Sequence, residues 1–81
     1  MANIESTLIN TLKQQLDIDE SEFKRNDNLI QTGLMDSIDL MEFINKIESD
    51  LSVEFDHEFL SDNENLTLEK LIQYLDSKKD N

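Results

Sequence analysis

Gly33-Leu34-Met35-Asp36-Ser37-Ile38-Asp39-Leu40-Met41-Glu42-Phe43 is the stretch that best predicts a local structure in this chain, because it contains the signals of a helix start. With Asp36 as the N-cap, Asp39 falls at the third helical position and can act as the acidic member of a capping box. Met35 and Leu40 have the spacing of a hydrophobic staple. Both signals place the start of an amphipathic helix directly after Asp36.

The residues that follow predict which face of this helix is buried. Apolar side chains recur at i, i+3, i+4 and i+7, which is the pattern of one helical face. These residues are Leu40, Phe43, Ile44 and Ile47, and Leu51 continues the same stripe to the helix end. We expect this stripe to lie in the core.

Two apolar side chains do not fit that stripe. Ile38 points nearly opposite to it and Met41 lies on its flank. Polar and acidic residues surround them, and we predict a docking face for a partner with basic rims. The residues of this docking face are Ile38, Met41, Glu42, Asp39 and Asn45. The alternative is that single exposed apolar residues are common on soluble proteins.

Length and composition limit what the chain can be. Its 81 residues are enough for one domain, residues 1–81, with only a small fully buried core. No cysteine is present for disulfides or thiolate metal sites, and His57 is the one histidine. With no proline and one glycine, the composition favours an all-α fold. No apolar run approaches a signal-peptide core or a membrane span, so we expect a cytoplasmic protein.

The charge predicts the kind of partner. Nineteen acidic and seven basic residues give a formal charge of -12, which repels nucleic acid and anionic membranes and attracts basic protein surfaces. We expect a monomer with basic protein partners, no nucleic-acid binding and no membrane insertion. The alternative is that the charge only keeps a small domain soluble.

The rest of the chain predicts two further main helices and one short one. A first helix over Ile4–Leu16 has a stripe of Ile4, Leu8, Leu12 and Leu16, widened by Ile9. A long connection from Asp17 to Met35 follows, and its apolar anchors are Ile18, Phe23, Leu29, Ile30 and Leu34. Within it, one helical turn over Asp27–Thr32 is expected to end at a left-handed Gly33.

After the second helix we expect an extended link and a short helix over about Asp56 to Leu60. Thr67 should cap the last helix, with Leu66 and Leu71 as its staple. Its buried stripe is Leu68, Leu71, Ile72 and Leu75, and its tail, about residues 78–81, is expected to fray. Together these helices predict a small bundle of three main helices and one short helix.

Ser37 is expected at the exposed tip of the second helix, where small polar residues are frequent for structural reasons alone. No base or nucleophile elbow in the sequence is placed to activate it, so we expect neither a hydrolase nor any catalytic site. A calcium loop starting at Asp17 also fails. Its sixth position is Glu22 where glycine is needed, and its twelfth is Asn28 where glutamate is needed. No metal site is expected.

The run Asp36-Ser37-Ile38-Asp39, with Gly33 and Leu34 before it and Leu40-Met41-Glu42-Phe43-Ile44 after it, resembles the attachment motif of phosphopantetheine-dependent carrier proteins, the acyl-carrier-like family. The order of the helices resembles that family over nearly the whole chain. The resemblance implies that Ser37 bears 4′-phosphopantetheine taken from coenzyme A by a phosphopantetheinyl transferase. It also implies that Asp36 serves transferase recognition, and that Ile38, Met41 and Glu42 contact partner enzymes.

The resemblance further implies a cargo held as a thioester on the arm. The approach Gly33-Leu34-Met35-Asp36-Ser37 is similar to that of stand-alone aminoacyl and D-alanyl carriers. These work with a loading ligase or acyltransferase, in a dedicated secondary or cell-envelope pathway. Fatty-acid carriers more often have a leucine after the serine and a proline after the second helix, where this chain has Ile38 and Asp56. Two alternatives remain, a carrier of fatty-acid synthesis and an acidic interaction module without a prosthetic group.

Overall fold

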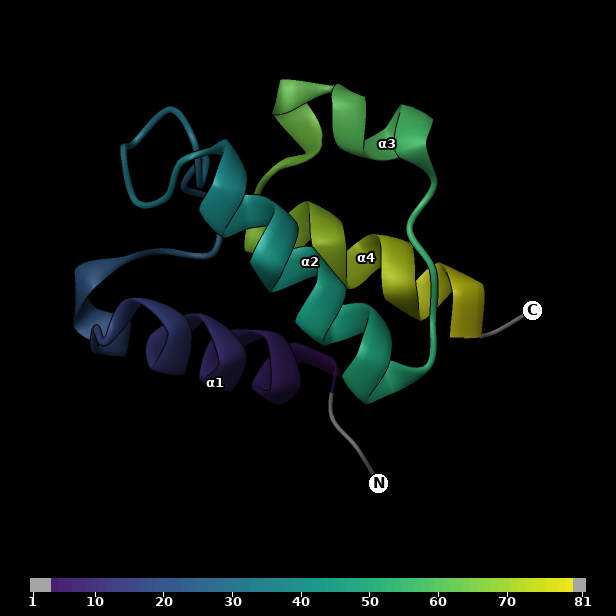
Figure 1. Ribbon diagram of the computed structural model, residues 1–81, viewed down its shortest axis with the longest axis horizontal. Coiled ribbons are helices and arrows are strands. Elements are labelled where there is room, and N and C mark those ends of the chain that lie inside the picture. Colours follow the sequence, from purple (N-terminus) through teal and green to yellow (C-terminus); the bar gives the residue numbers. More distant parts are fainter. Residues whose placement is uncertain (1–3, 80–81) are drawn as a thin grey trace.

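Three amphipathic helices build the core of the computed structural model, which describes residues 4–79 (Figure 1). They are α1 (Ile4–Leu16), α2 (Ser37–Leu51) and α4 (Leu68–Lys79). A short helix, α3 (His57–Ser61), and two 3₁₀ turns, η1 (Glu20–Glu22) and η2 (Asn63–Asn65), lie in the connections. Helix α1 packs against both α2 and α4. In Figure 1, α1 lies at the bottom and α3 at the top, with α2 and α4 between them. The predicted all-α bundle is confirmed.

One hydrophobic core joins the three long helices to both loops. Its buried residues are Ile4, Leu8, Leu12, Phe23, Leu29, Met35, Leu40, Phe43, Ile44, Ile47, Phe55, Leu66, Leu68, Leu71 and Leu75. The central part of each predicted stripe is therefore confirmed. Leu16, Leu51 and Ile72 are only partly buried. Leu16 and Leu51 are the last residues of their helices, so they project past the packed region.

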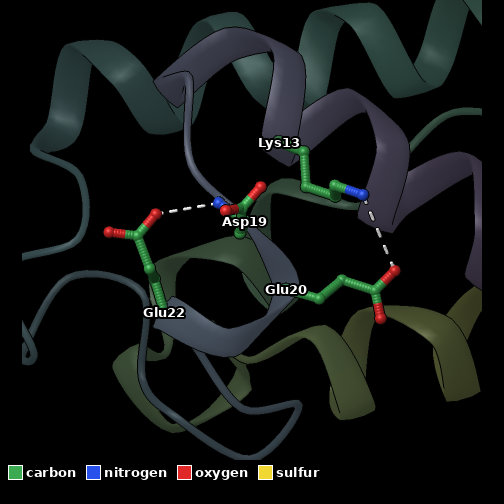
Figure 2. A network of polar contacts seen from close by, with 4 residues as sticks. All are labelled: Lys13, Asp19, Glu20 and Glu22. Carbon is green, nitrogen blue, oxygen red and sulfur yellow. Dashed lines mark hydrogen bonds and ion pairs between the residues drawn. The ribbon is translucent and has the colours of Figure 1, made fainter.

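The connection between α1 and α2 is anchored at both of its ends. Phe23 and Leu29 are buried, while Ile18, Ile30 and Leu34 pack partly buried against the core. This confirms the predicted anchors. The turn η1 lies just beyond α1, where the Asp19 N–H donates to Glu22 Oε2 at 2.8 Å (Figure 2). Lys13 of α1 lies 3.8 Å from Glu20, a weak ion pair between a half-buried and an exposed side chain. The turn η1 was not predicted from the sequence.

A single helical turn precedes α2, as predicted. The Thr32 N–H donates to the carbonyl of Asn28 at 3.1 Å, and the Gly33 N–H donates to that of Ile30 at 3.0 Å. Gly33 has a φ of 79° and ends this turn in the left-handed region. The chain then returns to the core, because the Met35 N–H donates to the carbonyl of Leu29 at 3.0 Å.

The second half of the chain follows the prediction with small shifts. Helix α3 starts at His57 and ends at Ser61, with Asp56 as its N-cap position. Thr67 caps α4, since its Oγ1 accepts a hydrogen bond of 3.1 Å from the Lys70 N–H. Residues 78 and 79 are part of α4, residues 80–81 lie outside the described part, and the fraying of the tail stays a prediction. No helix within residues 4–79 is both long and apolar enough to span a bilayer.

Candidate functional site: the start of α2

The first turn of α2 is fixed by Asp36. Its backbone is extended, with φ -95° and ψ -176°, and its Oδ1 accepts a hydrogen bond of 2.8 Å from the Asp39 N–H. This is the cap bond of the predicted capping box. A helix leaves the N–H groups of its first turn without partners inside the helix. The Asp36 carboxylate binds the N–H group of Asp39. The N–H groups of Ser37 and Ile38 therefore remain available to a group from outside the helix.

Ser37 is the first residue of α2 and is exposed, as the sequence predicted. The residue just before the cap, Met35, is 97% buried, since only 3% of its surface is exposed. The chain therefore leaves the core at Met35 and presents the serine two residues later. Ser37 and the available N–H groups belong to the same first turn of the helix.

The loop before α2 is held by Asn28. Its Oδ1 accepts hydrogen bonds from the N–H groups of Ile30 and Gln31, at 3.0 and 2.9 Å. Its Nδ2 donates to the carbonyl of Asn63 at 2.6 Å, and its backbone forms an isolated bridge with Thr67. One side chain thus connects the approach to the serine with the segment before α4. Sequence reasoning did not identify Asn28, because its partner lies 35 residues away.

The predicted docking face is largely brought together. Ile38 and Met41 are 70% and 58% exposed, the two large exposed apolar side chains found among the described residues. Glu42 and Asn45 are also exposed and lie four and seven positions after Ile38, on the same face of the helix. Asp39 lies at the edge of this face. It is half-buried, and its carbonyl accepts a hydrogen bond of 2.7 Å from Gln15 of α1.

A groove lies between α2 and α3, with a volume of about 310 Å³. We call it the α2–α3 groove. Its lining is Leu40, Met41, Ile44, Asn45, Glu48, Phe55, His57, Leu60 and Ser61. Met41 and Asn45 belong to both the docking face and the groove, so the two features are continuous. This groove was not predicted from the sequence, because its second wall comes from α3 and the linker before it.

A larger and more open hollow of about 710 Å³ lies by Ser49, Ser52 and Lys78, at the other end of α2 from Ser37. Within the part of the chain that the structure describes, no three His, Asp or Glu side chains come together in a way that could hold a metal ion. The α2–α3 groove begins at Leu40, three positions after Ser37 in the same helix.

These features define a class of protein: a small helical domain that presents an exposed serine at a helix start, beside an acidic face with two exposed apolar side chains. Comparison with protein families gives the more particular assignment. The family model described as a phosphopantetheine attachment site matches residues 6–75, most of the chain. The chain belongs to this family of phosphopantetheine-dependent carrier proteins. Neither the curated proteins nor the solved structures give a significant match.

Membership makes the chain a non-catalytic carrier with a 4′-phosphopantetheine prosthetic group. Carriers of this kind interact with a phosphopantetheinyl transferase and with biosynthetic enzymes. The residues at the start of α2 fit such a group. A phosphodiester needs an exposed hydroxyl and gains from nearby N–H donors, and Ser37 and Ile38 provide both. The α2–α3 groove offers an apolar surface close by. The family assignment favours a carrier over an interaction module without a prosthetic group.

Proposed function

We propose that Ser37 is the residue that bears 4′-phosphopantetheine. The observation that supports this most directly is its position: an exposed hydroxyl on the first residue of α2, after an Asp36 cap that leaves two N–H groups available. It also lies inside the range matched by the family model. A transferase needs access to the hydroxyl from outside, and the exposed tip of a helix gives that access.

The proposed modification is a transfer from coenzyme A. A bond forms between Ser37 Oγ and the phosphorus that bears the pantetheine, the bond from that phosphorus to the adenosine-diphosphate oxygen breaks, and 3′,5′-ADP leaves. The serine proton passes to a base on the transferase. When bound, the group supplies a thiol that holds cargo as a thioester. This chain contributes the serine that is modified, the N–H groups at the start of α2 and the surface that contacts partner enzymes.

Each neighbouring residue has a role in this proposal. Asp36 holds the first helical turn and is read by the transferase. Ile38 and Met41 enter an apolar depression on the partner, while Glu42 and Asn45 contact its rim. Asp39 contributes negative charge at the edge of the face. With a formal charge of -12, the chain would be attracted to basic docking surfaces.

We further propose that the cargo is an acyl or aminoacyl group of a dedicated secondary or cell-envelope pathway, loaded by a ligase or an acyltransferase. The support is the resemblance of Gly33-Leu34-Met35-Asp36-Ser37 to stand-alone aminoacyl carriers. A role in fatty-acid synthesis is the alternative. The proposal places the chain in the cytoplasm, because the modification of Ser37 consumes coenzyme A, and it treats the chain as a monomer.

The test is intact-mass measurement after coexpression with a broad-specificity phosphopantetheinyl transferase. We expect a phosphopantetheine-sized gain in the wild-type chain and in Ser49→Ala, and none in Ser37→Ala. Ser49 is a matched control, since it is also an exposed serine of α2 but lies near the other end of the helix. A gain that persists in Ser37→Ala, or the absence of any gain with several transferases, would overturn the proposal.

A separate variant distinguishes the two proposed roles of Asp36. Asparagine caps helices about as well as aspartate, so Asp36→Asn should keep the fold. If the carboxylate is read by the transferase, Asp36→Asn should be modified more slowly than the wild-type chain at equal enzyme concentration. An unchanged rate would limit the role of Asp36 to the cap.

A further inference from the structure

Helix α3 is held in place by other elements more than by its own packing. It has five residues and none of them is fully buried. Phe59 and Leu60 are only partly buried against the core. A helix of this length gains little from its own hydrogen bonds in water. Its position must therefore depend on side chains contributed by its neighbours.

One apolar neighbour of α3 is Tyr74 of α4. Its ring lies 4.2 Å from that of Phe59 and 5.3 Å from that of Phe55, measured between centroids. The rings of Phe55 and Phe59 lie 6.2 Å apart. We call these three side chains the aromatic cluster. Aromatic pairs at such distances contribute stability beyond the burial of their surface. Tyr74 is the member that connects α3 and the preceding linker to α4.

Polar contacts from α4 fix the same linker. The Tyr74 hydroxyl accepts a hydrogen bond of 2.9 Å from the N–H of Asp56, the residue just before α3. Lys78, one turn later, donates to the carbonyl of Glu54 at 2.8 Å, and its Nζ lies 5.2 Å from the centre of the Tyr74 ring. In Figure 1 the linker between α2 and α3 runs past the C-terminal half of α4.

The same segment forms one wall of the α2–α3 groove. Phe55, His57 and Leu60 line it on this side, while Leu40, Met41 and Ile44 line it from α2. Phe55 belongs both to the aromatic cluster and to the groove wall. A movement of α3 away from α4 would therefore change the width of the groove without disturbing the contacts of α1 with α2 and α4.

We propose that Tyr74 is a positioning residue that holds α3 against α4 and thereby sets the width of the α2–α3 groove. Local opening of α3 costs less than global unfolding because α3 lacks fully buried side chains. The Tyr74 hydroxyl and ring together control this opening. That the carried group would enter this groove rests on the proposed function. The role of Tyr74 in holding α3 does not depend on it.

The experiment compares amide hydrogen exchange in Ser37→Ala and in the double variant Ser37→Ala/Tyr74→Phe. Tyr74→Phe keeps the ring and removes the hydroxyl, and Ser37→Ala makes the result independent of any modification. Loss of one hydrogen bond should raise the exchange rate of Asp56 and of the α3 amides about threefold to tenfold. Amides of Leu12 and Phe43, in α1 and α2, should change less. The side-chain NMR signals of Met41 and His57, which line the groove, should shift.

Thr32→Val is the matched control, because it removes a hydroxyl that donates to the Asn28 carbonyl at 2.6 Å, in the loop before α2. It should leave the exchange of α3 and the signals of Met41 and His57 unchanged. Equal acceleration of α3 and core amides in Tyr74→Phe would mean that α3 opens only by global unfolding, which overturns the proposal. So would unchanged exchange at Asp56 and α3, or an equal effect of Thr32→Val on them.

Discussion

The carboxylate of Asp36 accepts a 2.8 Å hydrogen bond from the backbone N–H of Asp39, and this contact fixes the start of α2. Replacing a capping aspartate by alanine leaves that N–H without its partner. We expect Asp36→Ala to lower the free energy of unfolding by about 1 kcal/mol, whereas Asp36→Asn should change it by only a few tenths. Urea denaturation of the two variants would measure the difference. Because both remove the same charge, equal losses would show that charge, and not the cap, is responsible.

The exposure of Ile38 and Met41 predicts that they contribute little to folding. Ile38→Ala and Met41→Ala should each change the free energy of unfolding by less than about 0.5 kcal/mol. Ile47→Ala on the opposite face of α2 should cost roughly 2 to 5 kcal/mol, because Ile47 is fully buried. Chemical denaturation measures the three values. If a partner enzyme binds the docking face, Ile38→Ala and Met41→Ala should weaken binding while stability is kept. A stability cost like that of Ile47→Ala would contradict the assignment of the two faces.

Gly33 is needed for its backbone conformation. Its φ of 79° is strained for residues with a side chain, while a Cβ added there would meet nothing within 4 Å. We expect Gly33→Ala to lower the free energy of unfolding by about 1 to 2 kcal/mol. Gly33→Asn should cost less, because asparagine enters the left-handed region more readily. Thermal or urea unfolding of both variants tests this. An alanine variant as stable as the wild type would mean that the turn before Ser37 can change its conformation without cost.

The contact of Lys78 with Tyr74 predicts a measurable titration. Hydrogen bonding to the Tyr74 side chain is the largest cause that raises the pKa of Lys78 above its usual 10.5, and partial desolvation opposes it. A raised pKa in the folded state means that the contact stabilises the fold below about pH 10.5 and loses this effect as the pH rises through the folded-state pKa. In Tyr74→Phe the Lys78 pKa should fall toward 10.5, which the NMR shift of the Lys78 Cε group would record against pH. A midpoint identical in both proteins would show that the hydroxyl does not interact with the ammonium group.

Much of the fold could be predicted because helix signals are local. The limits of α1 and the cap of α2 depend on residues only a few positions apart in the sequence. The helical period likewise places Ile38 and Met41 outside the buried face of α2. Thr67 was predicted to cap α4 for the same reason. The prediction of buried stripes failed where helix ends extend past the core, as at Leu16 and Leu51, which are only partly buried. The turns η1 and η2 were missed because each is a single turn with no period to detect.

The sequence by itself determined which residues form the helices and which side of α2 carries the exposed residues Ile38 and Met41. The reason is that residues three or four positions apart lie on the same face of a helix. Only the tertiary structure decided what holds these elements together. Asn28 bonds to Asn63, Gln15 to Asp39 and Tyr74 to Asp56, across separations of 35, 24 and 18 residues. The α2–α3 groove likewise has walls from two segments. Such contacts depend on how the helices pack around the shared core, and no local period encodes that arrangement.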